Sequence, residues 1–132
     1  MHHLTVETRQ NQQVVDLTDQ VNRIVRERGL EIGLCHVCVM HTTAAISTAD
    51  LDPGTDLDML DAYAALIPKL KYRHPHNPAH VADHILATLI GPSVTLPVEH
   101  KALMLGTWQR VVLFEFDGPR SRQIIVTLTA EA

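Results

Sequence analysis

The chain has 132 residues, of which 45% are hydrophobic and 20% charged, a composition typical of one globular domain that buries its core without disulfides. The formal net charge is −4 and only two Phe, two Tyr and one Trp are present, which argues against a nucleic-acid surface built from cations and stacking aromatics. No apolar run approaches the roughly 20 residues that span a bilayer, and the N-terminus lacks the apolar core of a signal peptide, so we expect a cytoplasmic protein with no membrane partner.

The first part of the chain is predicted to form strands around one helix. Leu4 to Arg9 alternates apolar and polar side chains, as a strand with one exposed face does, and Gln12 to Asp16 continues from it. Apolar residues recur at helical spacing from Asp16 to Arg28, and Gly29 follows where a helix C-terminus favours glycine. Ile32 to Met40 is apolar almost throughout, which predicts a central strand covered on both faces.

Two cysteines lie inside that central strand. Cys35 and Cys38 have the C-x-x-C spacing that also occurs in zinc and redox sites. Positions three apart on a strand point to opposite faces, so the two thiols cannot share a metal ion. We therefore interpret both cysteines as small core residues.

The middle of the chain supplies two more helices and two short strands. An acidic, turn-rich connection at 50–58 leads into a helix that runs from Thr55 to about Leu66. Pro78 begins a third helix, which Gly91 closes after Ile90. The two short strands are predicted at Ser93 to Val98 and Ala102 to Leu105, joined by a hairpin loop.

The C-terminal part of the chain predicts a second, longer β-hairpin around DGPR at 117–120. A two-residue loop would place Asp117 opposite Arg120 and Glu115 opposite Arg122, with all four charges on one face. These charges either form ion pairs on a solvated face, or one arginine reaches a cleft where it binds a phosphate or carboxylate. The two strands would be Val111 to Phe116 and Gln123 to Leu128.

Histidine is unusually frequent, with nine in the chain. His41 follows the apolar strand and precedes Thr42 and Thr43, so it either ends the strand through a local bond or belongs to a site that a ligand approaches. His80 and His84 are four residues apart in the third helix and share one side of it, a spacing that suits either divalent-metal chelation or ordinary polar surface. The apolar face of this helix is predicted to be Val81, Ile85 and Leu89.

Six short motifs occur in order along the chain: HTTAA at 41–45, Asp-Pro at 52–53, Tyr-x-His at 72–74, Asp-His at 83–84, GTWQ at 106–109 and E-x-DGPR-x-R at 115–122. Over essentially the whole chain this set resembles the YjbQ family, small proteins often labelled secondary thiamine-phosphate synthase. The resemblance implies a single α+β domain over residues 1–132, a strand-dominated antiparallel β-sandwich with about three helices, assembled as a homotrimer.

The resemblance also implies a reaction and a polar site. The reaction joins a pyrimidine methyl diphosphate to a thiazole phosphate and releases pyrophosphate. The expected catalytic residues are His41, Glu115 and Asp117. The expected substrate-binding residues are Thr42, Thr43, Gln109, Arg120 and Arg122. The expected ligands of a divalent metal such as zinc are His41, His74 and His84.

The chain departs from the family pattern in two places. Ala49-Asp50 stands where the family usually has an Asn-Glu pair, and Ala79-His80 stands where Asp and Asn are usual. His80 is therefore a candidate substitute ligand.

Three functions fit these residues. The first is an enzyme acting on phosphorylated small molecules, in which arginines bind phosphate and histidines, with or without a metal, assist the leaving group. The second is a metal-dependent hydrolase or isomerase of unknown substrate. The third is a non-catalytic, ligand-binding trimer with the arginines and carboxylates at its interfaces.

Overall fold

Eight strands form two antiparallel sheets in the computed structural model, which describes residues 1–132. The larger sheet has the strand order β1-β8-β3-β5-β6 and the smaller sheet has the order β2-β7-β4. The strands are β1 (His2–Glu7), β2 (Gln13–Asp16), β3 (Ile32–Val39), β4 (Ala44–Ala49), β5 (Ser93–Glu99), β6 (Ala102–Leu103), β7 (Arg110–Glu115) and β8 (Ser121–Ala130). The helices are α1 (Thr18–Arg28), α2 (Thr55–Leu66) and α3 (Val81–Ile90), the last preceded by the 3-10 turn η1 (Pro78–His80).

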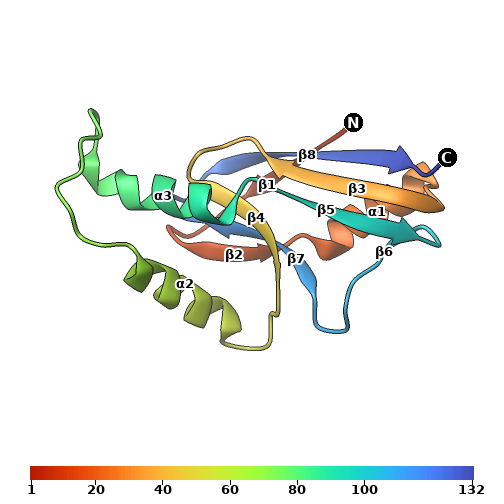
Figure 1. The fold of residues 1–132 in the computed structure, drawn as a ribbon, viewed down its shortest axis with the longest axis horizontal. Coiled ribbons are helices and arrows are strands. Elements are labelled where there is room, and N and C mark those ends of the chain that lie inside the picture. Colours follow the sequence, from red (N-terminus) through yellow and green to blue (C-terminus); the bar gives the residue numbers. More distant parts are fainter.

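The two sheets pack face to face, and α2 and α3 lie on the outer side of the smaller sheet (Figure 1). The principal core fills the space between the sheets and includes one face of α1. A second core lies between the smaller sheet and the two outer helices, and its buried residues are Ala45, Leu60, Leu86, Val112, Phe114 and Phe116. The predicted α+β sandwich with three helices is confirmed.

β7, rather than β3, is the strand buried on both faces. Val111 and Leu113 belong to the principal core, whereas Val112 and Phe114 belong to the second core. The prediction that the strand beginning at Ile32 is covered on both faces is wrong for this chain, because Ile32 remains 48% exposed. The helices pack mainly against β2, β4, β6 and β7, so the outer face of the larger sheet stays open.

β7 and β8 do not form the predicted hairpin. β7 pairs with β2 and β4 in the smaller sheet, whereas β8 pairs with β1 and β3 in the larger one. Both edges of β7 therefore already have hydrogen-bonded partners, and no edge is left for β8. Residues 116–120 cross from one sheet to the other, and we call this segment the crossover.

The helices occupy the predicted positions in the chain, and Gly29 ends α1 in the left-handed conformation, with φ 68°. The predicted apolar face of α3 is wrong, because Leu86 and Ala87 are buried whereas Leu89 is 64% exposed. Leu86 reaches the second core, which fixes the rotation of the helix about its axis. None of the helices is long and apolar enough to cross a membrane.

Candidate functional site

The crossover is held tightly against the loop that follows β1. The Thr8 N–H donates to the Arg120 carbonyl, and the Gly118 N–H donates to the Asn11 carbonyl, each at 2.9 Å. A Cβ on Gly118 would lie 2.1 Å from the Gln10 carbonyl oxygen, so only glycine permits this close approach. The crossover is therefore a fixed platform for the charged side chains beside it.

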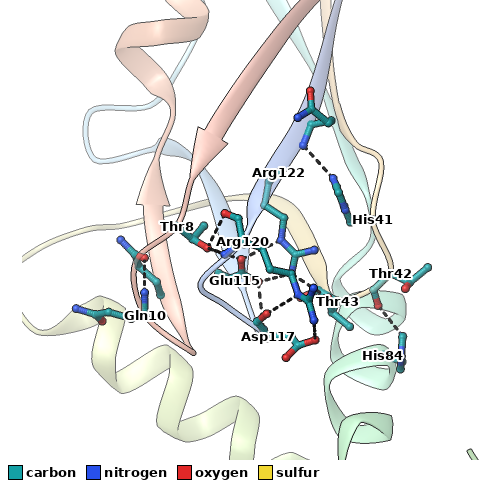
Figure 2. Close-up of polar contacts among 12 residues, drawn as sticks. Thr8, Gln10, His41, Thr42, Thr43, His84, Glu115, Asp117, Arg120 and Arg122 are labelled. Atoms are coloured by element: carbon teal, nitrogen blue, oxygen red, sulfur yellow. Dashed lines mark hydrogen bonds and ion pairs between the residues drawn. The ribbon is translucent and has the colours of Figure 1, made fainter. Parts of the chain in front are cut away.

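Glu115 and Arg122 form an ion pair buried between the sheets, with side chains 0% and 2% exposed (Figure 2). Arg122 donates from Nε to Glu115 Oε1 at 2.9 Å and from Nη2 to Oε2. Oε1 also accepts from Thr8 Oγ1 at 2.7 Å, and Oε2 accepts from the Asp117 N–H at 3.1 Å. Burial alone would raise the pKa of Glu115, but these hydrogen bonds outweigh it and lower the pKa below its ordinary value.

Arg122 keeps one amino group without a protein partner. Its Nη2 also donates to Thr43, to Oγ1 at 2.8 Å and to the carbonyl oxygen at 3.2 Å. Nη1 has no hydrogen-bond partner in the protein. Every fully buried side-chain nitrogen does have one, so Nη1 is not fully buried. It therefore reaches the pocket that Arg122 lines. The guanidinium is thus clamped on one edge and presents the other edge to the pocket.

Arg120 and Asp117 form a second ion pair at the exposed rim. Arg120 donates from Nη2 to Asp117 Oδ2 at 2.8 Å and from Nε to the Asp117 carbonyl at 2.7 Å. The arginine side chain is 51% exposed and the aspartate side chain 15%. A guanidinium has five N–H donors, so those not directed at Asp117 remain for a ligand.

The lone pair of His41 is used inside the protein. The Gln123 N–H donates to Nε2 of His41 at 2.9 Å. Because a backbone N–H can only donate, Nε2 carries the lone pair and Nδ1 carries the proton of the neutral ring. Burial, followed by the positive charge of Arg122, lowers the pKa of His41, so the ring is neutral near pH 7. His41 therefore offers a hydrogen-bond donor and no free base.

His84 presents the opposite kind of edge. Its Nδ1 lies 3.0 Å from the Thr42 carbonyl oxygen, which can only accept, so Nδ1 carries the proton and Nε2 has a lone pair with no protein partner. The His74 ring stacks on His84 with centroids 5.2 Å apart and planes 15° apart. His74 in turn accepts the Asn77 N–H at Nδ1, at 3.2 Å. His84 is thus the one of these three histidines whose lone pair is free.

These groups line a pocket of about 560 Å³ with no hydrophobic side chain in its wall. A cavity of this size is in the range of small-molecule sites. The crossover, the β3–β4 connection and α3 meet around it (Figure 2). The lining residues are His41, Thr42, Thr43, His80, His84, Asp117, Pro119, Arg120, Ser121 and Arg122.

Three of the expected site residues lie outside the pocket wall. Glu115 is buried beneath Arg122, and His74 lies against the ring of His84. Gln109 lies beyond the opposite end of β7, where its Nε2 donates to Thr48 Oγ1 and its Oε1 accepts the Gly106 N–H, both at 3.0 Å. The other expected residues line one pocket although they come from distant parts of the chain.

The pocket also contains residues that sequence analysis did not select. Pro119 and Ser121 line it, and the only sequence signal for them was their place beside the selected arginines. Asp83, which precedes His84, does not line this pocket and is half-buried; burial and then the charge of Asp117 raise its pKa. His80 lines the pocket, in keeping with its candidacy as a ligand.

The expected metal ligands do not form a preassembled set in this chain. No three His, Cys, Asp or Glu side chains are grouped so that they could hold an ion. His41 and His74 each use a ring lone pair to accept a backbone N–H, which leaves Nε2 of His84 as the free donor among the three. The donor chemistry of this trio therefore does not fit a divalent ion in this geometry.

The fold and the pocket together define a class: small single-domain α+β sandwich proteins with an arginine- and histidine-rich pocket at a sheet-to-sheet crossover. Within that class the chain belongs to the YjbQ family. The family model described as "UPF0047 protein YjbQ-like" matches residues 2–131. This confirms the resemblance that the sequence motifs indicated.

Relatives share the whole domain. A UPF0047 protein of Archaeoglobus fulgidus is 42% identical over 124 residues, covering 93% of this chain and 96% of its own. A YbjQ-like protein of unknown function from Sulfolobus solfataricus superposes with a TM-score of 0.92 at 34% identity, over 98% of this chain and 96% of that one. An uncharacterised family member from Clostridium acetobutylicum gives 0.89 at 33% identity, over 98% and 100%. These relatives establish the family and the fold.

Proposed function

We propose that this protein is an enzyme that acts on a phosphorylated small molecule bound in the pocket. The observation that carries the proposal is the clamped guanidinium of Arg122, whose side chain is 2% exposed and whose Nη1 edge is left for a ligand. Arg120 adds a second, partly exposed guanidinium at the rim. Arginine suits phosphate because its planar N–H donors match the spacing of phosphate oxygens.

Neutral donors complete the proposed anion site. The neutral ring of His41 offers Nδ1–H, and the hydroxyl-bearing Thr42 lies in the same wall. Asp117 would repel an anion, but its carboxylate is engaged by Arg120 at 2.8 Å, which offsets that repulsion. A phosphate dianion would therefore meet positive charge and hydrogen-bond donors at once.

For the reaction we propose the transfer that the family resemblance implies, which makes thiamine phosphate and pyrophosphate from a pyrimidine methyl diphosphate and a thiazole phosphate. A departing diphosphate carries several negative charges, and the two guanidiniums would stabilise them as they develop. The pocket volume of about 560 Å³ is compatible with substrates of this size.

Isothermal titration calorimetry with inorganic phosphate and with pyrophosphate tests the anion site. We expect the wild type to bind both, and Arg120→Ala to bind roughly tenfold or more weakly, since it loses charged hydrogen bonds. The matched control is Arg110→Ala, because Arg110 pairs with Asp16 at 2.8 Å outside this pocket and should leave binding unchanged. Wild-type protein that binds neither anion overturns the proposal.

The proposed synthesis of thiamine phosphate has its own test. Wild type and Arg120→Ala are incubated with the two thiamine precursors, and thiamine phosphate and pyrophosphate are quantified. We expect product from the wild type and little from the variant. Phosphate binding without product would rule out the synthase reaction. The proposal would then be limited to an enzyme that acts on another phosphorylated substrate.

A metal-dependent hydrolase or isomerase is a second candidate function. His80 and His84 are one helical turn apart and both line the pocket, so an ion bound there would need oxygen ligands from substrate or water in addition. Elemental analysis of untagged wild type and His84→Ala tests this candidate. A divalent ion near one per chain that the variant loses supports it, and no ion in the wild type removes it.

We also propose a homotrimer, as the family resemblance implies. Ile32 and Leu34 on the open face of the larger sheet are 48% and 49% exposed, which supports contact between copies. Light scattering after gel filtration measures the assembly. If the protein is only a ligand-binding scaffold with Arg120 at an interface, Arg120→Ala should split the trimer. A variant that stays trimeric but loses phosphate binding argues against this scaffold.

A further inference from the structure

We propose that the two pocket histidines have fixed and opposite roles, with His41 donating a hydrogen bond to the bound anion and His84 acting as the catalytic residue that accepts a proton. This inference rests on the proposed function and deepens it, because it assigns a separate task to each ring. The sequence-based expectation differs, since it named His41 and not His84 among the catalytic residues.

The assignment follows from hydrogen bonds that leave no choice of direction. Both neutral rings carry their proton on Nδ1, because Nε2 of His41 accepts a backbone N–H and Nδ1 of His84 faces a carbonyl oxygen. The same tautomer therefore exposes a donor at His41 and a lone pair at His84. Both residues line the same pocket.

His84 has the support that a positioned base requires. The Thr42 carbonyl holds its Nδ1–H at 3.0 Å, and this bond fixes the direction of the lone pair on Nε2. The stacked ring of His74, 5.2 Å away, limits rotation from one side. His74 is itself fixed by the Asn77 N–H, so we assign it as a positioning residue.

The proton step is balanced within the pocket. The O–H bond of the attacking water or of a substrate hydroxyl breaks, and its proton forms a bond with Nε2 of His84. The oxygen keeps the electron pair and attacks the phosphorylated substrate, and phosphate or diphosphate leaves with the electron pair of the bond that breaks. A thiazole nitrogen attacks without losing a proton, so this step belongs to transfer to water or to a hydroxyl. The resulting imidazolium lies near Asp83, with which it interacts electrostatically. The proton then passes to bulk water, since the pocket opens to the surface.

Diethyl pyrocarbonate provides a test that needs no substrate, because it acylates imidazole nitrogens with a free lone pair. After a short exposure at pH 7, peptide mass mapping gives the modification rate of each histidine. We expect His84 to react roughly tenfold faster than His41, whose Nε2 must first break a hydrogen bond. His100, with a side chain 82% exposed, reports that the reagent is active. His41 reacting as fast as His84 overturns the inference.

Two matched variants test the separate roles. His84→Asn keeps an N–H near the Nδ1 position for the Thr42 carbonyl but has no base at Nε2. We expect unchanged phosphate affinity and a kcat about 10²-fold to 10⁴-fold lower, with little change in KM, for hydrolysis of the pyrimidine methyl diphosphate by water, followed as released pyrophosphate. His41→Gln keeps an acceptor for the Gln123 N–H but has no donor at Nδ1. Here we expect phosphate affinity to fall about five- to tenfold.

The outcomes separate this inference from the function on which it rests. Wild type that binds neither phosphate nor pyrophosphate contradicts the proposed function, while the acylation rates still report the ring orientations. Wild type that binds phosphate, together with unchanged affinity in His41→Gln or faster acylation of His41, contradicts the role assignment alone.

Discussion

Two arginine–carboxylate pairs flank a single crossover in opposite environments. The side chains of Glu115 and Arg122 are 0% and 2% exposed, whereas those of Asp117 and Arg120 are 15% and 51% exposed. The buried pair lies between the two sheets and satisfies the carboxylate with four hydrogen bonds. The rim pair lies in the wall of the pocket (Figure 2).

Burial decides what each of these ion pairs does. A charge left alone between the sheets would lack both partner and water, so removing one member of a buried pair is strongly destabilising. An exposed pair is screened by solvent and contributes about 0–1 kcal/mol. The buried pair therefore holds the scaffold and leaves only the Nη1 edge of Arg122 for a ligand, whereas the rim pair is held loosely and can contact the ligand with more of its groups.

The largest expected effect tests the buried side of this comparison. Arg122→Ala should lower the free energy of unfolding by about 3–5 kcal/mol, because Glu115 is left as an uncompensated buried charge. Urea unfolding followed by circular dichroism measures the change.

A double variant serves as the control for that prediction. Arg122→Met with Glu115→Leu removes both charges and should recover much of the lost stability, since no buried charge remains. A double variant as unstable as Arg122→Ala would show that packing, and not the unpaired charge, causes the loss.

Thr8 links the two pairs, and its removal should have the next largest effect. Its hydroxyl donates to Glu115 Oε1 at 2.7 Å and accepts the Arg120 N–H at 2.8 Å. Thr8→Val keeps the shape and leaves both groups short of a partner, which should lower the free energy of unfolding by about 1–3 kcal/mol. Thr8→Ser keeps the hydroxyl and should lose clearly less; equal losses in the two variants would contradict the role of these bonds.

The pH dependence of stability tests the contribution of the buried pair separately, through the titration of Glu115. The folded-state pKa of Glu115 lies below its ordinary value of about 4.3, so the unfolded state binds more protons between the two values. The contribution of Glu115 is therefore complete above that ordinary value and is lost as pH falls through the folded pKa, with a slope of up to about 1.4 kcal/mol per pH unit. Free energies of unfolding from pH 6 to pH 3 measure it.

The comparison variant for this pH profile is Glu115→Gln. It cannot titrate, so its free energy of unfolding should change less steeply in the acid range than that of the wild type. Parallel profiles would mean that Glu115 has the same proton affinity in both states.

The smallest effect on stability is expected at the rim. Arg120→Ala should change the free energy of unfolding by less than about 1 kcal/mol, because the pair is solvated, while phosphate affinity falls. Thermal unfolding and calorimetry on the same preparation measure the two quantities. A variant that loses several kcal/mol of stability would place Arg120 with the scaffold and erase the contrast with Arg122.

Much of the fold was accessible from sequence because it depends on short-range patterns. Helical spacing and a terminal glycine located α1, and strand-forming composition located β7 and β8. The motifs at 41–45 and 115–122 placed most of the pocket residues in one candidate site before their positions were known. Even the charge partners, Glu115 with Arg122 and Asp117 with Arg120, were predicted correctly.

The reason for those partnerships was nevertheless wrong. A hairpin would have put all four charges on one solvated face, whereas the crossover lets Glu115 and Arg122 meet between two sheets. The sequence could not distinguish these cases, because a turn of the same composition can join neighbouring strands or strands of different sheets.

The amino-acid sequence was enough to predict the α+β class, the positions of the helices and of the strands other than β4 (Ala44–Ala49), and which residues carry charge or an imidazole. Three features could be seen only in the folded protein: β7 is buried on both faces, the Glu115–Arg122 pair is buried between the sheets, and His41 exposes Nδ1–H whereas His84 exposes the lone pair of Nε2. The physical reason is the separation along the chain of the residues that interact. Helix spacing and capping act within a few residues, whereas sheet membership, desolvation and the direction of a hydrogen bond depend on partners distant in the chain, such as Gln123 for His41 and Thr42 for His84.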